Sequence, residues 1–327
     1  MKIYVFDVRD DELESIELEK SKYDYEIVVR RDSLTKDTIQ ELEKGSAVSV
    51  LGMNSYGEEE MKLLSNQEIY YLSTRTIGFN HIDLEAAKKY GVHVCNASYA
   101  PNGVADYTVM MMLLCLRHYK QALWRMQVND FSLGGLMGKE MKDLTVGIIG
   151  TGRIGTQVAK NLSGFGCKII GYDPYENEIF KEIGNYVSLD ELYKISDIIT
   201  LHVALNDSNH HMINEETISK MKDGVVLINC ARGPLMDLQA LIQGIESEKI
   251  GALGLDTIET EEEIVHKDLK TDIFSDRDLA YIKQFKNVVY TQHMAFYTDA
   301  AVRSMVETGV GGLVKMIQKE SFREQLC

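Results

Sequence analysis

The chain has 327 residues, a length typical of two domains rather than one. Its hydrophobic content of 45% and charged content of 26% are ordinary for globular proteins, which excludes a disordered, collagen-like or coiled-coil chain. The 35 Lys and Arg residues against 50 Asp and Glu residues give a net charge of −15, which argues against nucleic acid or an anionic membrane surface as partner. A small-molecule partner is expected.

Five cysteines are scattered without C-x-x-C spacing, so neither a disulfide framework nor a zinc knuckle is indicated. The N-terminal segment becomes charged within seven residues and lacks the long apolar stretch of a signal peptide. The longest apolar run, residues 109–116, is too short to cross a bilayer. These features predict a protein of the reducing cytoplasm with no membrane segment.

Short β-rich runs alternate with longer amphipathic stretches along nearly the whole sequence, the pattern typical of βαβ units and a parallel sheet. Helical stretches such as residues 84–89 separate the early runs. The first series of predicted strands lies at residues 3–6, 26–29, 48–51, 69–73 and 92–94. This series predicts one small α/β unit.

A turn-rich break at residues 99–103 precedes a long apolar helix at about residues 104–119. A last amphipathic helix, roughly residues 298–319, belongs to no strand series and is predicted to cross back to the first unit. The second series of predicted strands lies at residues 145–149, 168–172, 198–202, 225–228, 252–255 and 288–291. Six strands predict a doubly wound sheet.

The predicted fold class is therefore α/β, with two doubly wound parallel-sheet domains. The smaller domain is discontinuous and is formed by residues 1–98 and 297–327, whereas residues 99–296 form the larger domain. The two chain crossings would let the domains hinge around a cleft.

A G-x-G-x-x-G pattern directly follows the first strand of the second series and opens a helical stretch. Gly150 permits a tight turn, Gly152 lets a pyrophosphate approach the backbone, and Gly155 allows close packing of helix on strand. Arg153 and Ile154 begin the helix, where the phosphates are expected.

Asp173 ends the next strand, eighteen residues after Gly155, and is the acid expected to bind the adenine ribose hydroxyls. The glycine motif, the strand and helix that flank it and the acid at the end of the next strand all agree. The larger domain is therefore predicted to be a Rossmann-type NAD-binding domain. Asp173 would also repel a 2′-phosphate, and residues 174–176 offer no Arg to hold one. NAD is therefore predicted over NADP.

Three polar residues stand just beyond successive strands of the second series, where ligands bind in open α/β sheets. Arg232 has a fork of donors that suits a carboxylate. Glu261 comes five residues after Asp256, and His293 ends the last strand. Histidine exchanges a proton readily near neutral pH, and a neighbouring carboxylate favours its charged form.

These segments carry a family resemblance. Residues 228–234 (INCARGP), the spacing of the two acids and residues 293–298 (HMAFYT) resemble the D-2-hydroxyacid dehydrogenase family, and the ending is most similar to its D-lactate dehydrogenase branch. Residues 71–83 and 98–102 are also similar to that branch, which includes the vancomycin-resistance dehydrogenases. The resemblance covers essentially the whole chain.

The resemblance implies a flavodoxin-like substrate domain beside the NAD domain, and a 2-oxo acid reductase that regenerates NAD. NADH would deliver hydride to the carbonyl carbon while His293 donates a proton to the carbonyl oxygen. Glu261 would hold and charge the imidazole, and Arg232 would bind the substrate carboxylate and polarise the carbonyl.

The resemblance also implies supporting residues. The backbone N–H groups of Ile77 and Gly78 and the hydroxyl of Tyr99 would help to bind the substrate. Phe296 and Tyr297 would shape the pocket for the substrate side chain.

Asp256 is expected either to tune His293 or to contact the cofactor. Two positions depart from the family pattern, because Ala204 and Gln292 stand where proline is common. These changes bear on the rigidity of the loops near the nicotinamide and His293, and they remove no catalytic side chain.

Other chemically suggestive residues are assigned structural roles. His210 and His211 are adjacent and have no accompanying carboxylate or thiolate spacing, so no metal is predicted. Cys230 is expected to pack at a strand end. The Met-rich residues 110–112 are expected on a buried helix, around which the resemblance implies a homodimer.

The function predicted first is an NAD-dependent D-2-hydroxyacid dehydrogenase that reduces pyruvate to D-lactate. One alternative is the same chemistry on a bulkier 2-oxo acid, such as 2-oxoisocaproate, phenylpyruvate or 2-oxoglutarate. An alternative of another class is an NAD(H)-sensing interaction protein, like the corepressors that share this fold. Such a sensor would bind NADH and barely turn over.

Overall fold

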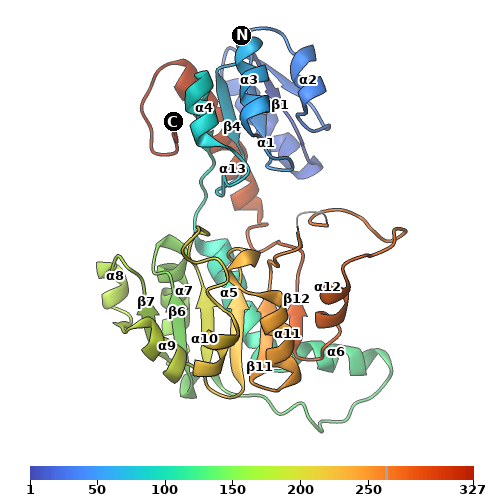
Figure 1. Ribbon diagram of the computed structural model, residues 1–327, viewed down its shortest axis with the longest axis vertical. Helices are drawn as coiled ribbons and strands as arrows, with labels where there is room; N and C mark the ends of the chain where they lie inside the picture. The colour runs from blue at the N-terminus through green and yellow to red at the C-terminus, as the bar shows by residue number, and fades with distance from the viewer. Residues whose placement is uncertain (262–263) are drawn as a thin grey trace. The chain divides into compact units, whose positions relative to one another are not determined.

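The computed structural model describes residues 1–261 and 264–327, and the chain forms two compact units (Figure 1). The first unit comprises Met1–Ala100 and Tyr297–Cys327, and the second comprises Pro101–Phe296. The first crossing therefore follows Ala100 rather than residue 98. Each unit has its own parallel sheet, which confirms the predicted fold class.

The sheet of the first unit has the strand order β2-β1-β3-β4-β5. This order is that of flavodoxin-like folds, as the resemblance implied. Every residue of β3 is buried, as expected for a central parallel strand covered on both faces. The strands are β1 (Lys2–Val5), β2 (Glu26–Val29), β3 (Ala47–Val50), β4 (Tyr71–Thr74) and β5 (His93–Asn96).

Helices from both ends of the sequence pack on this sheet. Five of them are the 3-10 helix η1 (Asp10–Glu12), α1 (Leu13–Lys22), α2 (Lys36–Glu41), α3 (Glu58–Asn66) and α4 (Leu84–Tyr90). The sixth, α13 (Asp299–Ile317), begins with Thr298 as its N-cap. Its buried residues Val306, Val310 and Leu313 share a core cluster with strand β1. The last helix is therefore part of the first unit's core.

A fully buried ion pair lies beneath α13. The Nε atom of Arg75 is 2.8 Å from Oε1 of Glu12, and both side chains have no exposed surface. The same guanidinium donates to the carbonyl of Phe6 at 2.7 Å. A Cβ on Gly309 of α13 would lie 2.9 Å from Cγ of Arg75, so the helix needs glycine there to approach the pair.

The sheet of the second unit has the order β12-β11-β10-β9-β6-β7-β8. Counted from its first strand, this is the Rossmann order 3-2-1-4-5-6 with one more strand at the edge. The strands are β6 (Thr145–Ile149), β7 (Lys168–Tyr172), β8 (Asn185–Tyr186), β9 (Ile198–Leu201), β10 (Val225–Asn229), β11 (Ile250–Leu255) and β12 (Val288–Tyr290). Strand β8 is not among the six predicted because its two residues carry no apolar signal.

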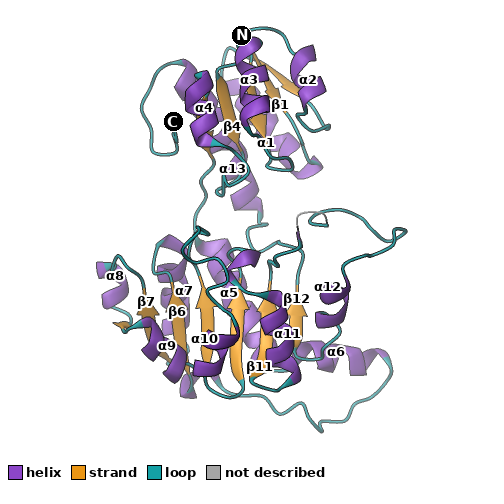
Figure 2. Ribbon diagram, viewed as in Figure 1, coloured by secondary structure: helices purple, strands orange, loops and turns teal. Residues whose placement is uncertain are grey.

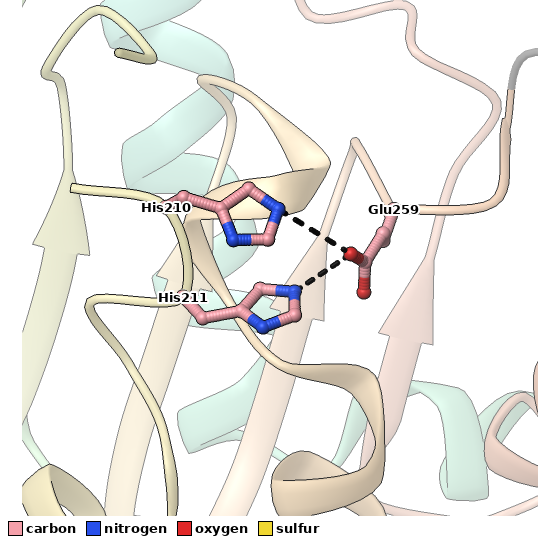
Figure 3. A group of neighbouring side chains, drawn as sticks. All are labelled: His210, His211 and Glu259. Carbon is pink, nitrogen blue, oxygen red and sulfur yellow. Dashed lines mark hydrogen bonds and ion pairs between the residues drawn. The ribbon is translucent and has the colours of Figure 1, made fainter. Parts of the chain in front are cut away.

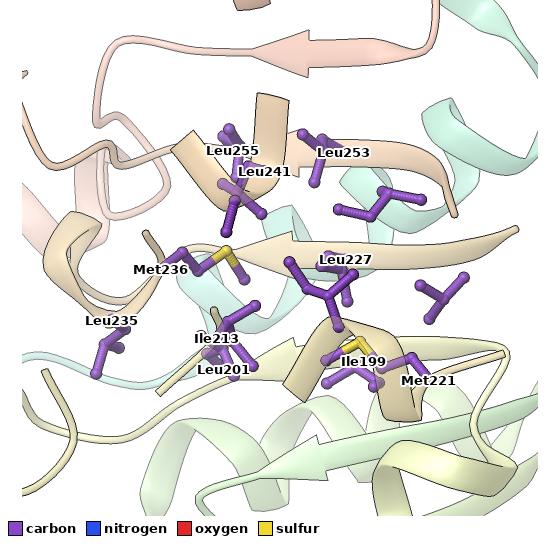
Figure 4. Packing of buried hydrophobic residues seen from close by; sticks show 14 of the residues in the cluster. Ile199, Leu201, Ile213, Met221, Leu227, Leu235, Met236, Leu241, Leu253 and Leu255 are labelled. Carbon is purple, nitrogen blue, oxygen red and sulfur yellow. The ribbon is translucent and has the colours of Figure 1, made fainter. Parts of the chain in front are cut away.

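Helices lie on both faces of this sheet (Figure 2), and none of the helices in the described ranges is long and apolar enough to span a membrane. One face is packed by Leu241 and other aliphatic side chains of α11 against Leu227 and Leu253 of the sheet (Figure 4). The helices are α5 (Asn102–Leu116), α6 (Tyr119–Gln127), α7 (Arg153–Ser163), α8 (Glu178–Lys181), α9 (Leu189–Ile195), α10 (Glu215–Lys220), α11 (Leu238–Glu246) and α12 (Arg277–Ile282), with 3-10 helices η2 (Met141–Asp143) and η3 (Gly233–Leu235).

Replacing Arg75 with Met should destabilise the first unit by about 3–5 kcal/mol, because it leaves the carboxylate of Glu12 buried without its partner. Urea unfolding followed by circular dichroism measures this loss. Lys88→Met, which removes an exposed ion pair with Glu85, is the control and should change the midpoint little. Equal midpoints for the two variants would contradict a structural role for the buried pair.

Candidate active site

The turn between β6 and α7 has the geometry of a dinucleotide-binding loop. Gly150 has φ +93°, and a Cβ there would lie 2.6 Å from the carbonyl carbon of His202. A Cβ on Gly155 would lie 1.9 Å from the carbonyl oxygen of Gly150, so both positions require glycine. A Cβ on Gly152, the N-cap of α7, would meet no atom within 4 Å. The loop thus leaves space where a pyrophosphate would approach the helix N-terminus.

Asp173 lies beside this turn. Its carboxylate accepts hydrogen bonds from the backbone N–H of Thr151 at 2.8 Å and of Tyr175 at 2.9 Å. The acid is therefore held between the glycine loop and the end of β7, which fits its predicted place at the adenine ribose. Arg153 and Ile154 form the first turn of α7. These residues together fit a bound NAD.

Arg232 stands three residues beyond β10, and the side chain of Asn229 fixes the turn that carries it. The buried Asn229 accepts from the N–H of Ala231 at 3.0 Å and donates to the carbonyl of Arg232 at 2.8 Å. The guanidinium of Arg232 folds back onto the turn that carries it, where one of its nitrogens donates to the carbonyl of Ala231 at 2.7 Å. The following Gly233 is essential, because a Cβ there would lie 2.1 Å from the carbonyl carbon of Ile258.

His293 and Glu261 form a pair beyond the ends of β12 and β11. The Nδ1 atom of His293 lies 3.0 Å from Oε1 of Glu261, and the second carboxylate oxygen accepts from the N–H of Ile258 at 3.2 Å. Since a carboxylate only accepts, Nδ1 donates and Nε2 is left as the nitrogen that exchanges a proton. The side chains of His293 and Glu261 are 30% and 13% exposed, so solvent screens the pair only partly. The predicted pair is thus brought together.

Asp256 holds the segment that presents His293. Its fully buried carboxylate accepts from the hydroxyl of Thr291 at 2.6 Å and from the N–H groups of Met294 at 2.9 Å and Ala295 at 2.8 Å. Its carbonyl accepts from the N–H of His293 at 2.8 Å, and His293 has φ +55°. This arrangement favours an anchoring role over the cofactor contact predicted for Asp256.

Two further rings lie close to the ring of His293. The ring centroids of His266 and Phe296 lie 6.2 and 6.3 Å from that of His293, and 6.1 Å from each other. The Nε2 atom of His266 is 3.1 Å from the carbonyl oxygen of His293. Sequence reasoning singled out Phe296 but not His266, whose loop has no strand or glycine pattern to mark it.

The remaining predicted substrate-binding residues all lie in the first unit. Ile77 and Gly78 lie in the first unit, where their carbonyls accept from Asn96 and Thr76 side chains at 2.7 Å each. Tyr99 belongs to the same unit. Their contact with substrate stays a prediction.

The two positions that depart from the family's prolines are accommodated by hydrogen bonds. Asn209 donates to the carbonyl of Ala204 at 2.7 Å and accepts from the N–H of Asn206 at 2.8 Å, which braces this loop without a ring. Gln292 is exposed, and the Asp256 contacts hold its neighbours. Cys230 is buried as expected, and burial raises the pKa of its thiol, which keeps it protonated.

Comparison with known proteins agrees with this geometry. Residues 109–295 match the family described as D-isomer specific 2-hydroxyacid dehydrogenase, NAD binding domain. The chain belongs to the D-2-hydroxyacid dehydrogenase family. It is 45% identical to an aromatic 2-oxoacid reductase of Clostridium sporogenes over 99% of both chains. This dehydrogenase is an NAD-dependent oxidoreductase, as predicted.

Solved structures place the whole chain in the same family. A D-lactate dehydrogenase of Treponema pallidum is 33% identical over 100% of both chains, with a TM-score of 0.90. An NAD-complexed D-isomer specific 2-hydroxyacid dehydrogenase of Lactobacillus delbrueckii ssp. bulgaricus is 32% identical over 100% of both chains, with a TM-score of 0.86. The second match supports NAD as the cofactor of this dehydrogenase.

Replacing Gly152 with Ala should weaken NADH binding by about tenfold or more, because the methyl group would occupy the space left for the pyrophosphate. Gly152 has φ −66°, so the backbone accepts Ala without strain and the melting temperature should not fall. Fluorescence titration with NADH measures the affinity. Gly164→Ala, at the other end of α7, is the control; matching affinities in the two variants would refute the placement.

Replacing Asp256 with Asn should lower the free energy of unfolding by about 1–3 kcal/mol and should also lower kcat. The NH₂ group of the amide would face a backbone N–H that donates to the carboxylate in the wild type, so that N–H would lose its acceptor. Thermal melting and steady-state rates measure the two effects. Asp197→Asn is matched, since it removes a carboxylate that accepts from the N–H of Thr145 at the start of β6. The Asp197→Asn control should lose stability but keep its kcat. An equal loss of kcat in both variants would argue against a role of Asp256 in anchoring the His293 segment.

Proposed function

We propose that this dehydrogenase reduces aromatic 2-oxo acids of the phenylpyruvate class to D-2-hydroxy acids. The observation that carries the proposal is the pair of rings, His266 and Phe296, beside His293. Aromatic groups favour partners with centroids about 4.5–7 Å away, so a substrate ring next to the reacting carbonyl would find two of them. The methyl group of pyruvate would use neither.

The relatives support the same choice. The aromatic 2-oxoacid reductase of Clostridium sporogenes is 45% identical to this chain, whereas a D-lactate dehydrogenase of Lactiplantibacillus plantarum is 36% identical. Pyruvate reduction to D-lactate, the first choice from sequence, stays a prediction, as do the bulkier aliphatic acid 2-oxoisocaproate and 2-oxoglutarate. Family membership favours catalysis over the NAD(H)-sensor alternative.

In the proposed reaction each polar residue has one task. The guanidinium of Arg232 binds the substrate carboxylate and orients the carbonyl. Bound NADH supplies a hydride to the carbonyl carbon. His293 gives the proton of Nε2 to the carbonyl oxygen, and Glu261 stabilises the protonated ring through Nδ1 before that transfer. A new C–H bond and a new O–H bond complete the 2-hydroxy acid.

The remaining site residues keep their predicted roles as part of the proposal. The N–H groups of Ile77 and Gly78 and the hydroxyl of Tyr99 add donors for the substrate, as the family resemblance implies. Asp173 selects NAD over NADP, since its carboxylate would repel a 2′-phosphate. The test of this preference is the ratio of kcat/KM for NADH and NADPH.

We also propose a homodimer in a reducing compartment such as the cytoplasm. All five cysteines are free thiols, as a reducing compartment requires. Helix α6 has no buried residue, and its apolar side chain Trp124 is 47% exposed. The following loop exposes 82% of Leu133 and 91% of Met137. Exposed apolar side chains gathered in one stretch of chain are typical of a protein interface.

Parallel assays of NADH oxidation with phenylpyruvate, pyruvate, 2-oxoisocaproate and 2-oxoglutarate, followed by chiral analysis of the products, test the substrate proposal. We expect phenylpyruvate to exceed pyruvate in kcat/KM by about tenfold or more and to yield the D product. Phe296→Leu should narrow this ratio without lowering the pyruvate rate. A higher kcat/KM with pyruvate than with phenylpyruvate would overturn the proposal of an aromatic substrate and favour the prediction that the enzyme reduces pyruvate to D-lactate.

Replacing His293 with Gln should lower kcat by about 10²–10⁴-fold, because the amide cannot donate the proton of an imidazolium. The dissociation constant for NADH should not change, since the glycine loop and Asp173 are untouched. Rapid-mixing kinetics and NADH fluorescence measure the two quantities. His93→Gln, at an exposed position on β5, is the control. A near-normal rate would remove His293 as the acid.

Replacing Leu133 with Glu should shift the protein from dimer to monomer, because a charge would be buried at the proposed interface. Light scattering coupled to size-exclusion chromatography measures the mass. Ile273→Glu changes a side chain of the same size that is 95% exposed and lies outside the α6 region, so its mass should match the wild type. A wild-type monomer, or a dimer in the Leu133 variant, would contradict the proposed interface.

A further inference from the structure

His210, His211 and Glu259 direct their side chains toward one another in the second unit (Figure 3). The Nε2 atom of His211 is 2.6 Å from Oε1 of Glu259, and the Nε2 atom of His210 is 3.8 Å from the same oxygen. The three ligand atoms all lie within 4.8 Å of one another. Two imidazole nitrogens and a carboxylate oxygen thus converge on one point.

The backbone of His211 explains how two adjacent histidines converge. Neighbouring side chains normally diverge, and for this reason the sequence predicted no metal here. His211 has φ +52°, in the left-handed region, and the two imidazole rings lie close together, with centroids 3.9 Å apart and planes tilted by 31°. Its N–H donates to the carbonyl of Pro234 at 2.8 Å, and its carbonyl accepts from Asn214 at 2.9 Å. The carboxylate comes from Glu259, which no local spacing could reveal.

The opposite side of the His211 ring faces a second carboxylate. Oδ2 of Asp237 lies 4.0 Å from Nδ1 of His211, while Oδ1 accepts from two N–H groups at the start of α11. This distance is longer than a hydrogen bond, so Asp237 adds a negative charge near the non-ligating nitrogen without the hydrogen bond usual for a metal-bound histidine. The side chains of His210, His211 and Glu259 are 52%, 32% and 29% exposed, so an ion and a water ligand can reach them.

We propose that His210, His211 and Glu259 bind a divalent transition ion of the Zn²⁺ type, with water completing a four-coordinate shell. Two imidazoles and one carboxylate suit Zn²⁺, whereas Mg²⁺ and Ca²⁺ take all-oxygen sets. Bonds of about 2.0–2.1 Å in tetrahedral geometry hold donor atoms about 3.4 Å apart. The His211–Glu259 distance of 2.6 Å would open and the His210–Glu259 distance of 3.8 Å would close, each by less than about 1 Å.

Ion binding replaces the hydrogen bond between His211 and Glu259. Glu259 stands two residues before Glu261, on the turn that packs closely on Gly233. An ion would therefore fix one end of the turn that carries the partner of His293. The binding site itself does not depend on which 2-oxo acid the enzyme reduces.

The test is calorimetric titration of the metal-free, full-length protein with Zn²⁺, without substrate or cofactor. We expect one saturable site, with affinity lowered by about tenfold or more in His210→Ala, a change at an exposed side chain. Glu259→Gln should show the same loss. His93→Ala, which removes an exposed histidine from β5, should bind like the wild type.

Co²⁺ as a spectroscopic probe separates this site from the thiols. The expected spectrum has the visible bands of a tetrahedral nitrogen and oxygen set, lost in His210→Ala, without a thiolate charge-transfer band. A thiolate band would place the ion on a cysteine such as Cys167 or Cys327, which are the half-buried ones, and would overturn the proposal. Equal Zn²⁺ affinity in the wild type and His210→Ala, or no binding to either, would also overturn it.

Discussion

The buried carboxylate of Asp256 is the contact on which the geometry of the candidate active site depends. It takes hydrogen bonds from one side chain and two backbone groups of the segment that follows β12, and its own carbonyl accepts from the N–H of His293. A buried charge is costly unless donors surround it, and these donors are available only in one conformation of residues 291–295. The same contacts hold His293 at a positive φ, which turns its ring toward Glu261.

The parallel sheet explains why the catalytic candidates come from distant points of the sequence. Strands β10, β11 and β12 are neighbours with parallel pairing, so their carboxyl ends lie along one edge. Arg232, Glu261 and His293 each follow one of these strands. The absence of a side chain on Gly233 brings the Arg232 turn against the main chain at Ile258. The topology brings the three residues to one edge, and close backbone packing sets the fine geometry.

Much of this arrangement is predictable from sequence because it has a local signal. The strands 145–149 and 168–172 match β6 and β7, since apolar runs between turns mark buried parallel strands. The glycine spacing likewise marks the loop after β6. The two-residue β8 has no such signal, because only two residue pairs with β7 define it. Sequence predicts elements well where burial is continuous along them.

Interactions between distant residues were the part that sequence could not supply. The convergence of His210, His211 and Glu259 depends on one left-handed residue and on a turn far along the chain. Asp256 could be singled out by its spacing from Glu261. Its role depends on backbone N–H groups, which nearly every residue carries and which therefore leave no signal in the sequence. Asn229 was visible in the run before Arg232, yet its task of closing that turn appears only with both hydrogen bonds in place.

Charge poses a final constraint, since a protein with a net charge of −15 must attract an anionic 2-oxo acid and an anionic dinucleotide. The net charge acts over long distances and is screened by salt within about 8–10 Å, so local groups decide the binding. The N–H groups at the start of α7 provide positive potential for phosphates, and Arg232 provides it beyond β10. Both lie beyond carboxyl ends of the same parallel sheet, where β6 and β10 each pair with β9. One edge of an acidic protein thereby becomes the place where two anions can meet.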